Sequence, residues 1–368
     1  MRIAVLKETA ERERRVALLP DSAAKLVKAG VEIAVERGAG LSAGARDEAY
    51  TEAGATLAPD ARAACAGAAV VVKVQPPTRD EAALLGQGTV LVSLLPVADH
   101  KDLLALLAER RVTALALERV PRITRAQSMD VLSSQATISG YKAVLVGASN
   151  LARMLPMMTT AAGNIPPAKA FVIGAGVAGL QAIATAKRLG AVVSAFDVRA
   201  AAAEQVQSLG AAFVATELAS EAAQDKGGYA KAQSDDERTR TLETLDKHLK
   251  DMDLVISTAA IPGRRAPVLI TDEMVGHMKR GAVIVDLAAE TGGNCTLTKP
   301  GETIEVNGVT IIGPLNLAST VPVHASQMLS RNIFTLLQYF VKDGTIGIDL
   351  ADEIAGAMAV THAGEIRA

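Results

Sequence analysis

Ala170-Phe171-Val172-Ile173-Gly174-Ala175-Gly176-Val177-Ala178-Gly179 is the most informative segment of the chain for its fold. Apolar residues lead into a glycine pattern of the form GxGxxG, and a helical run from Leu180 to Leu189 follows it. This order predicts a strand, a tight turn and a helix, the first unit of a dinucleotide-binding sheet. A lone GxGxxG match is a weak signal, but here the residues on both sides support it.

Each glycine of this pattern has its own expected task. Gly174 permits the tight turn, Gly176 lets the backbone approach a pyrophosphate, and Gly179 lets the helix pack closely on the strand. The start of the helix, at Val177 and Ala178, would offer free N–H groups and a positive dipole end to the phosphates. These five residues are predicted cofactor contacts. The alternative is a glycine-rich turn that holds no ligand.

A second predicted strand, residues 191–196, ends at Asp197, 18 residues beyond Gly179. A carboxylate at this place can accept hydrogen bonds from the adenosine ribose and repels a 2′-phosphate, which favours NAD over NADP. Arg199 argues in the other direction, because an arginine nearby could accommodate that phosphate. We give the carboxylate at the strand end more weight, and predict that Asp197, Val198 and Arg199 contact the cofactor.

The rest of the chain repeats the alternation of strands and helices that is typical of parallel sheets. The expected fold is α/β, with two Rossmann-like doubly wound parallel-sheet domains linked by long helices. Residues 1–132 with about 320–368 would form one domain, and residues 133–319 the other. The alternative keeps a C-terminal helix, about 324–341, on the second domain. Strands are expected at 3–6, 31–35, 70–74, 89–94, 113–117, 170–173, 191–196, 212–215, 253–258, 282–286 and 309–312, and a long helix at about 134–155.

Composition argues against several classes of function. Acidic and basic residues nearly cancel, 40 against 38, so the chain has no electrostatic footprint for nucleic acid or an anionic membrane surface. The two cysteines, Cys65 and Cys295, fit no metal or CxxC spacing and suit a reducing cytosol. The uncharged stretch 170–186 is short and rich in glycine, so we expect no membrane insertion. No metal site is expected.

The polar segment 121–130, Pro-Arg-Ile-Thr-Arg-Ala-Gln-Ser-Met-Asp, resembles the nucleotide-contact loop of the NAD(H)-binding domain of proton-translocating transhydrogenases. The resemblance implies that Arg122, Gln127 and Asp130 contact the nicotinamide carboxamide and its ribose, with Ser133 assisting. It also implies that Tyr229 lies on a mobile loop that closes over the site. From composition alone, the polar segment 217–251 is equally a solvated helical excursion or a mobile lid. The likeness continues through 132–135, 140–144, 157–163, 227–231 and 286–295.

The same resemblance implies an activity that this chain would share with partners. NAD(H) bound here would exchange a hydride with NADP(H) held by a partner subunit, and a membrane-spanning subunit would couple the transfer to proton translocation. The chain would be a homodimer, cytoplasmic and peripheral on the inner membrane through those partners. A non-catalytic NAD-binding module is a further hypothesis.

Alanine dehydrogenases share this architecture and supply the competing hypothesis. Their chemistry needs an acid/base group and residues that grip a carboxylate. Of their Arg, Lys, His and Asp, the first two are retained as Arg15 and Lys73, whereas the others fall on Pro96 and Glu290. Proline transfers no proton, and the nearest histidine is His100. Hydride transfer between two nicotinamides needs only the two rings held in contact, so the lack of a histidine suits it.

Overall fold

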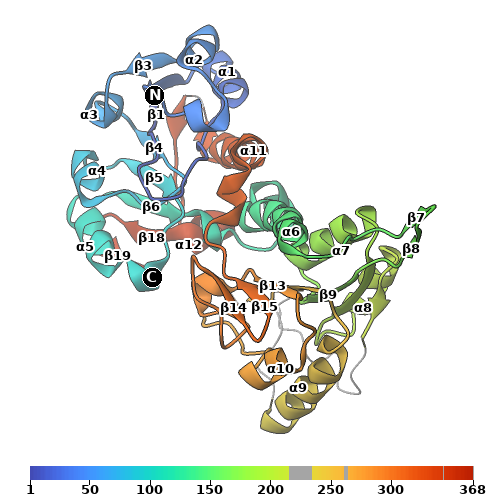
Figure 1. Cartoon of the computed structure of the whole chain (residues 1–368). Helices are drawn as coiled ribbons and strands as arrows, with labels where there is room; N and C mark the ends of the chain where they lie inside the picture. Colours follow the sequence, from blue (N-terminus) through green and yellow to red (C-terminus); the bar gives the residue numbers. More distant parts are fainter. Residues whose placement is uncertain (215–233, 261–263, 343, 368) are drawn as a thin grey trace. The chain divides into compact units, whose positions relative to one another are not determined.

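The computed structural model describes residues 1–214, 234–260, 264–342 and 344–367 (Figure 1). The chain forms two compact units, Met1–Gln135 with Ala318–Ala368, and Ala136–Leu317. Each unit contains one mostly parallel sheet covered by helices. The expected α/β class with two Rossmann-like parallel sheets is therefore confirmed. The exact domain boundaries stay a prediction, because a compact unit is not by itself an independently folding domain.

The first unit holds an eight-stranded sheet in the order β19-β18-β6-β5-β4-β1-β2-β3. Strands β1 to β6 run parallel, and β18 and β19 add an antiparallel edge. The five strands expected here are present, whereas the short β3 and the C-terminal pair were not predicted. The bounds are β1 Arg2–Val5, β2 Glu32–Glu36, β3 Thr56–Ala58, β4 Val70–Val72, β5 Val90–Ser93, β6 Thr113–Ala116, β18 Ala359–His362 and β19 Glu365–Ile366.

One long helix of the first unit comes from near the end of the chain. Helix α11 (Pro322–Phe340) begins with a proline, which suits the first helical position. Its face with Leu329, Ile333 and Leu336 joins the same buried cluster as Ile3 of β1. This packing places α11 in the first unit. The other helices there are α1 Pro20–Lys28, α2 Asp47–Glu52, α3 Ala61–Cys65, α4 Arg79–Leu84, α5 Lys101–Glu109 and α12 Glu353–Met358.

The second unit holds a seven-stranded sheet in the order β11-β10-β9-β12-β13-β15-β14. The six expected strands are parallel, and the strand order reverses between β9 and β12, the switch point at which dinucleotides bind in such sheets. The seventh strand, β14, was missed. The bounds are β9 Lys169–Ile173, β10 Val192–Phe196, β11 Ala212–Phe213, β12 Leu254–Ser257, β13 Val283–Asp286, β14 Thr303–Val306 and β15 Val309–Ile312.

Helix α6 (Val131–Asn150) starts in the first unit and continues into the second. The expected range, about 134–155, was wrong at both ends. The helix starts earlier because Asp130 accepts hydrogen bonds from the backbone N–H and the hydroxyl of Ser133, which caps its first turn. The expected loop before it contains a 3-10 helix, Thr124–Met129.

Four further helices belong to the second unit: α7 Val177–Arg188, α8 Ala202–Ser208, α9 Asp235–Leu249 and α10 Asp272–His277. Helix α9 occupies the end of the polar segment 217–251, and a capping box between Ser234 and Glu237 starts it. That part is a solvated helix, whereas 217–233 lies outside the described residues. No helix in the described ranges is long and apolar enough to cross a membrane.

Candidate functional site

The turn between β9 and α7 has a backbone shape that only glycines allow. Gly174 has φ +92°, and a Cβ there would lie 2.7 Å from Thr258 Oγ1. A Cβ on Gly179 would collide with the carbonyl oxygen of Gly174, so helix and turn are in direct backbone contact. A Cβ on Gly176 would meet no atom of the described residues within 4 Å. The turn is therefore tight at both ends and open in the middle, which fits the close approach of a pyrophosphate.

Helix α7 presents its amino end at this opening. Its N-cap is Gly176, where no side chain of the described residues forms a capping hydrogen bond. The first N–H groups of a helix have no partner within the helix, so those of Val177 and Ala178 can donate to an anion. Val177 is 41% exposed, and the helix is 12 residues long. Both residues thus lie where the sequence placed phosphate contacts.

Asp197 follows β10 and connects the second strand to the glycine turn. Its side chain is buried, and its Oδ2 accepts a hydrogen bond of 2.8 Å from the backbone N–H of Ala175. Arg199 donates Nε to Oδ1 and Nη2 to Oδ2, both at 2.8 Å. These hydrogen bonds to Asp197 raise the pKa of Arg199 above its ordinary value. Val198, between them, packs partly buried against the core on the β9 face with Phe171 and Phe196.

Thr258 belongs to this turn although no sequence motif pointed to it. It follows β12, and its hydroxyl donates to the carbonyl oxygen of Gly174 at 2.8 Å. A hydroxyl-bearing residue directly after a buried strand is the only local signal that could have pointed to it.

The loop that resembles the transhydrogenase nucleotide loop lies in the first unit. Arg122 and Gln127 are exposed, and Asp130 and Ser133 are held together by hydrogen bonds of 2.9 and 2.6 Å. Ala126 is fully buried and anchors the loop in the core. The structure therefore brings together Asp130 and Ser133 and leaves the side chains of Arg122 and Gln127 at the surface of this unit.

A residue from α11 fixes both ends of the turn that carries Asp130. Asn332 Nδ2 donates to the carbonyl oxygen of Ser128 at 2.8 Å, and Ser134 Oγ donates to Asn332 Oδ1 at 2.7 Å. Asn332 lies about 200 positions further along the chain, so no local sequence signal connects it to the loop. The glycine turn belongs to the second unit, and Tyr229 with Gly227 and Gly228 lies outside the described residues.

Buried ion pairs lie beyond the ends of β1 and β4. Arg15 forms a two-pronged pair with Glu13, at 2.8 and 2.7 Å, and donates to Gln135. Burial would raise the pKa of Glu13, but its hydrogen bonds with Arg15 lower that pKa to about 2. Lys73 pairs with Glu81 at 2.8 Å and lies 3.8 Å from Glu8.

Glu8 is the unusual acid of this cluster. Burial raises its pKa to about 7, although Lys73 and the backbone N–H of Val74 act to lower it. The cluster holds three carboxylates and two cations, so a proton on Glu8 balances its charge. Both cations that alanine dehydrogenases use, Arg15 and Lys73, are engaged in these internal pairs.

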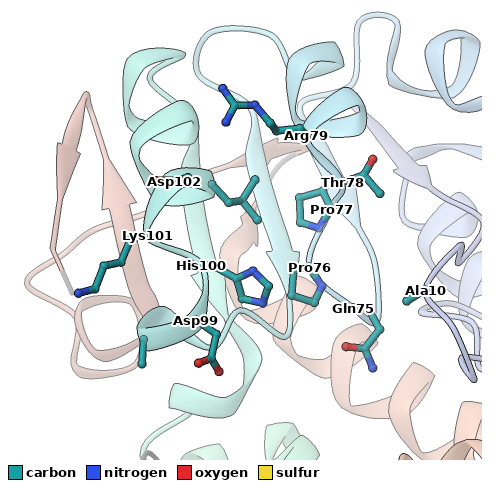
Figure 2. A pocket seen from close by; sticks show the side chains of 12 residues that line it. Ala10, Gln75, Pro76, Pro77, Thr78, Arg79, Asp99, His100, Lys101 and Asp102 are labelled. Atoms are coloured by element: carbon teal, nitrogen blue, oxygen red, sulfur yellow. The ribbon is translucent and has the colours of Figure 1, made fainter.

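A cavity of about 730 Å³ opens between the loops that follow β4 and β5 (Figure 2). Figure 2 shows Gln75 on one loop and His100 on the other. Pro96, two residues before this second loop's lining residues, offers no proton. Glu290, in the second unit, accepts a hydrogen bond of 2.5 Å from the backbone N–H of Asn316.

The two parallel sheets, the glycine turn at a switch point and the carboxylate after the second strand define a two-domain, Rossmann-like oxidoreductase of the nicotinamide-nucleotide class. Family models described as alanine dehydrogenase/PNT, N-terminal domain and C-terminal domain, match residues 4–139 and 143–368. The chain belongs to the alanine dehydrogenase/PNT family.

Individual relatives are more specific. The first of the separate pieces of the NAD(P) transhydrogenase subunit alpha of Rhodospirillum rubrum is 48% identical over 100% of this chain and 97% of its own length. The alanine dehydrogenase of Bacillus subtilis is 31% identical over 88% of this chain and 81% of that protein. The solved transhydrogenase from Sinorhizobium meliloti covers all of both chains with 43% identity and a TM-score of 0.90. An L-alanine dehydrogenase structure covers 100% of this chain and 97% of its own, with 27% identity and a TM-score of 0.84. The resemblance to the transhydrogenase alpha subunit, with alanine dehydrogenases as relatives, is confirmed.

Proposed function

We propose that this chain is the NAD(H)-binding subunit of a proton-translocating transhydrogenase. It holds NAD(H) for hydride exchange with NADP(H) bound on a partner subunit, and a membrane-spanning partner couples that exchange to proton translocation. Similarity over the whole of this chain to a protein named as NAD(P) transhydrogenase subunit alpha supports this role. The observation that carries the choice of reaction is Pro96, a residue without an acid or base where alanine dehydrogenases are expected to have histidine.

NAD(H) is the cofactor that the second unit fits best. The pyrophosphate would lie over the open middle of the glycine turn, at Gly174, Gly176, Val177, Ala178 and Gly179. The adenosine ribose would lie at Asp197, with Val198 and Arg199 beside it. Asp197 supports NAD(H) over NADP(H) because its carboxylate is already bonded to Ala175, where a 2′-phosphate would meet negative charge.

The nicotinamide end would be oriented by the loop of the first unit. Arg122, Gln127 and Asp130 would contact the carboxamide and ribose, with Ser133 holding Asp130, and Tyr229 belongs to this proposal by resemblance alone. The bound cofactor supplies the hydride. The residues of this chain bind, orient and exclude water, and approximation of that kind accounts for roughly 7–11 kcal/mol of a barrier.

Alanine dehydrogenase activity has weaker support. The pyruvate reaction requires proton transfer as well as hydride transfer. Pro96 transfers no proton, and the carboxylate of Glu290 is bonded to the backbone of Asn316. Arg15 and Lys73 favour this reaction in the sequence, but both are paired with buried carboxylates.

The proposal includes a homodimer, peripheral on the cytoplasmic face of the inner membrane through its partners. The surface that best suits contact with a second copy is the hairpin of β7 (Met158–Thr160) and β8 (Gly163–Ile165), which projects from the second unit (Figure 1). All six residues of its strands are exposed, and residues 154–168 carry no charged side chain. An isolated two-stranded hairpin is only marginally stable in water, so a partner surface would stabilise it.

A reconstitution experiment tests the function. The pure chain is mixed with the NADP(H)-binding subunit of a transhydrogenase, and hydride transfer from NADH to an acetylpyridine analogue of NADP⁺ is followed by absorbance. Transfer should require both proteins. Pyruvate with ammonium serves as the second substrate set, and steady NADH oxidation by the chain alone under those conditions would contradict the transhydrogenase role.

A further inference from the structure

Asn294, in the segment between β13 and β14, has a fully buried side chain whose hydrogen-bonding capacity is completely used. Its Nδ2 donates to the carbonyl oxygens of Ala259 and Pro267, both at 2.8 Å. Its Oδ1 accepts from Ser257 Oγ at 2.5 Å and from the backbone N–H of Ala259 at 3.1 Å. An amide has two donors and two acceptor positions, so every one of them has a partner here.

These bonds fix the residues that follow β12. The amide of Asn294 pairs with both the N–H and the C=O of Ala259, as a residue of a neighbouring strand would. Thr258, one residue earlier, donates its hydroxyl to the carbonyl oxygen of Gly174. A Cβ on Gly174 would lie 2.7 Å from Thr258 Oγ1 and 3.2 Å from the nitrogen of Ala259. Asn294 therefore holds the segment that closes against the first glycine of the turn.

Asn294 is itself mounted rigidly at the end of β13. Asp286 Oδ2 accepts hydrogen bonds from the backbone N–H groups of Asn294 and Cys295, at 2.7 and 3.0 Å, and from the hydroxyl of Thr298 at 2.7 Å. Gly293, with φ +77°, makes the bend that brings Asn294 back towards β12. The mount and the amide together connect the ends of β13 and β12.

We propose that Asn294 is a positioning residue for nicotinamide-nucleotide binding: through Thr258 and Ala259 it sets the shape of the pyrophosphate-binding turn. This role rests on the NAD(H)-binding function proposed above. The turn is supported from both neighbouring strands, by Asp197 at Ala175 on the β10 side and by Thr258 at Gly174 on the β12 side. Its middle stays open, since a Cβ added at Gly176 would meet no described atom within 4 Å. A shift of either support changes how the turn fits a pyrophosphate.

The test uses Asn294→Asp, which keeps the shape and replaces the donor Nδ2 with an oxygen that faces two carbonyls. At pH 8 the ionised carboxylate repels both carbonyls, and the dissociation constant for NADH, read by fluorescence, should rise about tenfold. Burial favours the neutral carboxyl, which can donate one hydrogen bond, so affinity for ADP-ribose should partly recover as the pH falls to 6. AMP, which has no pyrophosphate, should bind within about twofold of wild type at both pH values.

Asn307→Asp is the matched control, since Asn307 is exposed in the turn between β14 and β15 of the same unit. It should leave all three dissociation constants and their pH dependence unchanged. Thr258→Val tests the next contact along the chain: it removes the hydroxyl bond to Gly174, and it should weaken NADH and ADP-ribose but not AMP. This variant decides the question if Asn294→Asp does not fold, as judged by calorimetry.

Folded Asn294→Asp or Thr258→Val with wild-type affinity for NADH would overturn the role of Asn294. Equal weakening of AMP and ADP-ribose would also overturn it, because the defect would then not lie at the pyrophosphate. A wild-type chain that binds no NADH contradicts the proposed function itself. The two failures are therefore distinguished by the wild-type titration.

Discussion

Arg199 occupies the carboxylate of Asp197 with two side-chain hydrogen bonds of 2.8 Å, and its backbone N–H adds a third at 2.9 Å. Ala175 of the glycine turn donates the fourth. A carboxylate has about four acceptor positions, so those of Asp197 are all filled. A ribose hydroxyl can reach Asp197 only in exchange for a bond from Arg199, which makes the pair a single unit in cofactor choice.

Asp197→Ala should therefore change both affinity and selectivity. Losing a charged hydrogen bond to ribose costs roughly 1.5–3 kcal/mol, so NADH should bind roughly tenfold more weakly or worse. The same change releases the guanidinium of Arg199 beside the 2′ position, so the preference for NADH over NADPH should narrow. Fluorescence titration with both nucleotides measures this, with Asp236→Ala on the exposed start of α9 as the control. An NADH dissociation constant equal to that of wild type would remove Asp197 from the site.

Gln127→Asn should separate binding from transfer. The side chain of Gln127 is exposed on a loop whose backbone is fixed by buried Ala126 and by Asn332, so a shorter amide changes reach and leaves the loop in place. NADH affinity should stay near that of wild type. Transfer to an NADP⁺ analogue on the partner should slow roughly tenfold, which corresponds to about 1.4 kcal/mol of barrier.

Stopped-flow absorbance with the partner present measures that rate. Gln205→Asn, on the exposed face of α8, makes the same chemical change away from the loop and should transfer at the wild-type rate. A large loss of NADH affinity in Gln127→Asn, or an unchanged transfer rate, would show that Gln127 does not orient the ring.

The glycine turn was predictable in detail because each glycine meets a local steric requirement. A positive φ at Gly174 and a backbone contact at Gly179 depend only on residues within one strand, turn and helix. Strand β14 was also within reach: Asn307 and Gly308, with φ +54° and +80°, form the two-residue turn that commonly joins antiparallel strands. The pattern was present in the sequence and was not used.

The supports of the site were beyond sequence reasoning for a different reason. Asn332 and Ser128 are separated by 204 positions, and Asn294 and Ser257 by 37. Such pairs meet only because the sheets bring distant strand ends to one edge, and an isolated asparagine gives no periodic signal. The start of α6 was misjudged for a related reason, since Asp130 was interpreted only as a ligand contact and also caps the helix.

The projecting hairpin gives a prediction about the homodimer. Met157 and Met158 are 67% and 38% exposed, and Ile165 beside them is 44% exposed. Met157→Asp with Met158→Asp would place two charges in an apolar contact, so the dimer should dissociate at protein concentrations that leave the wild type associated. Sedimentation velocity measures this. Leu41→Asp, at a 60% exposed apolar residue of the first unit, should leave the association unchanged. A double variant that sediments as the wild type does would exclude the hairpin from the interface.

Glu8 gives a prediction about stability and pH. Its pKa is about 7 in the folded chain and 4.5 when unfolded, so between these values the folded state binds more protons than the unfolded state. Stability attributable to Glu8 is therefore full below about pH 4.5 and falls as the pH rises towards 7, by at most about 1.4 kcal/mol per pH unit. The lowered pKa of Glu13, about 2, acts in a separate window, because that stability is lost as the pH falls from 4.5 towards 2.

Glu8→Gln cannot ionise and should remove this dependence. Urea unfolding from pH 5 to 8 gives the free energy of unfolding for both chains, and the advantage of wild type over Glu8→Gln should shrink steadily up to about pH 7 and then level off. Taking the difference cancels the groups that titrate in both chains. Glu11→Gln, at an 87% exposed side chain in the same loop, should run parallel to wild type throughout. If the Glu8→Gln curve also runs parallel to wild type, Glu8 is ionised across this range and the buried cluster carries a net negative charge.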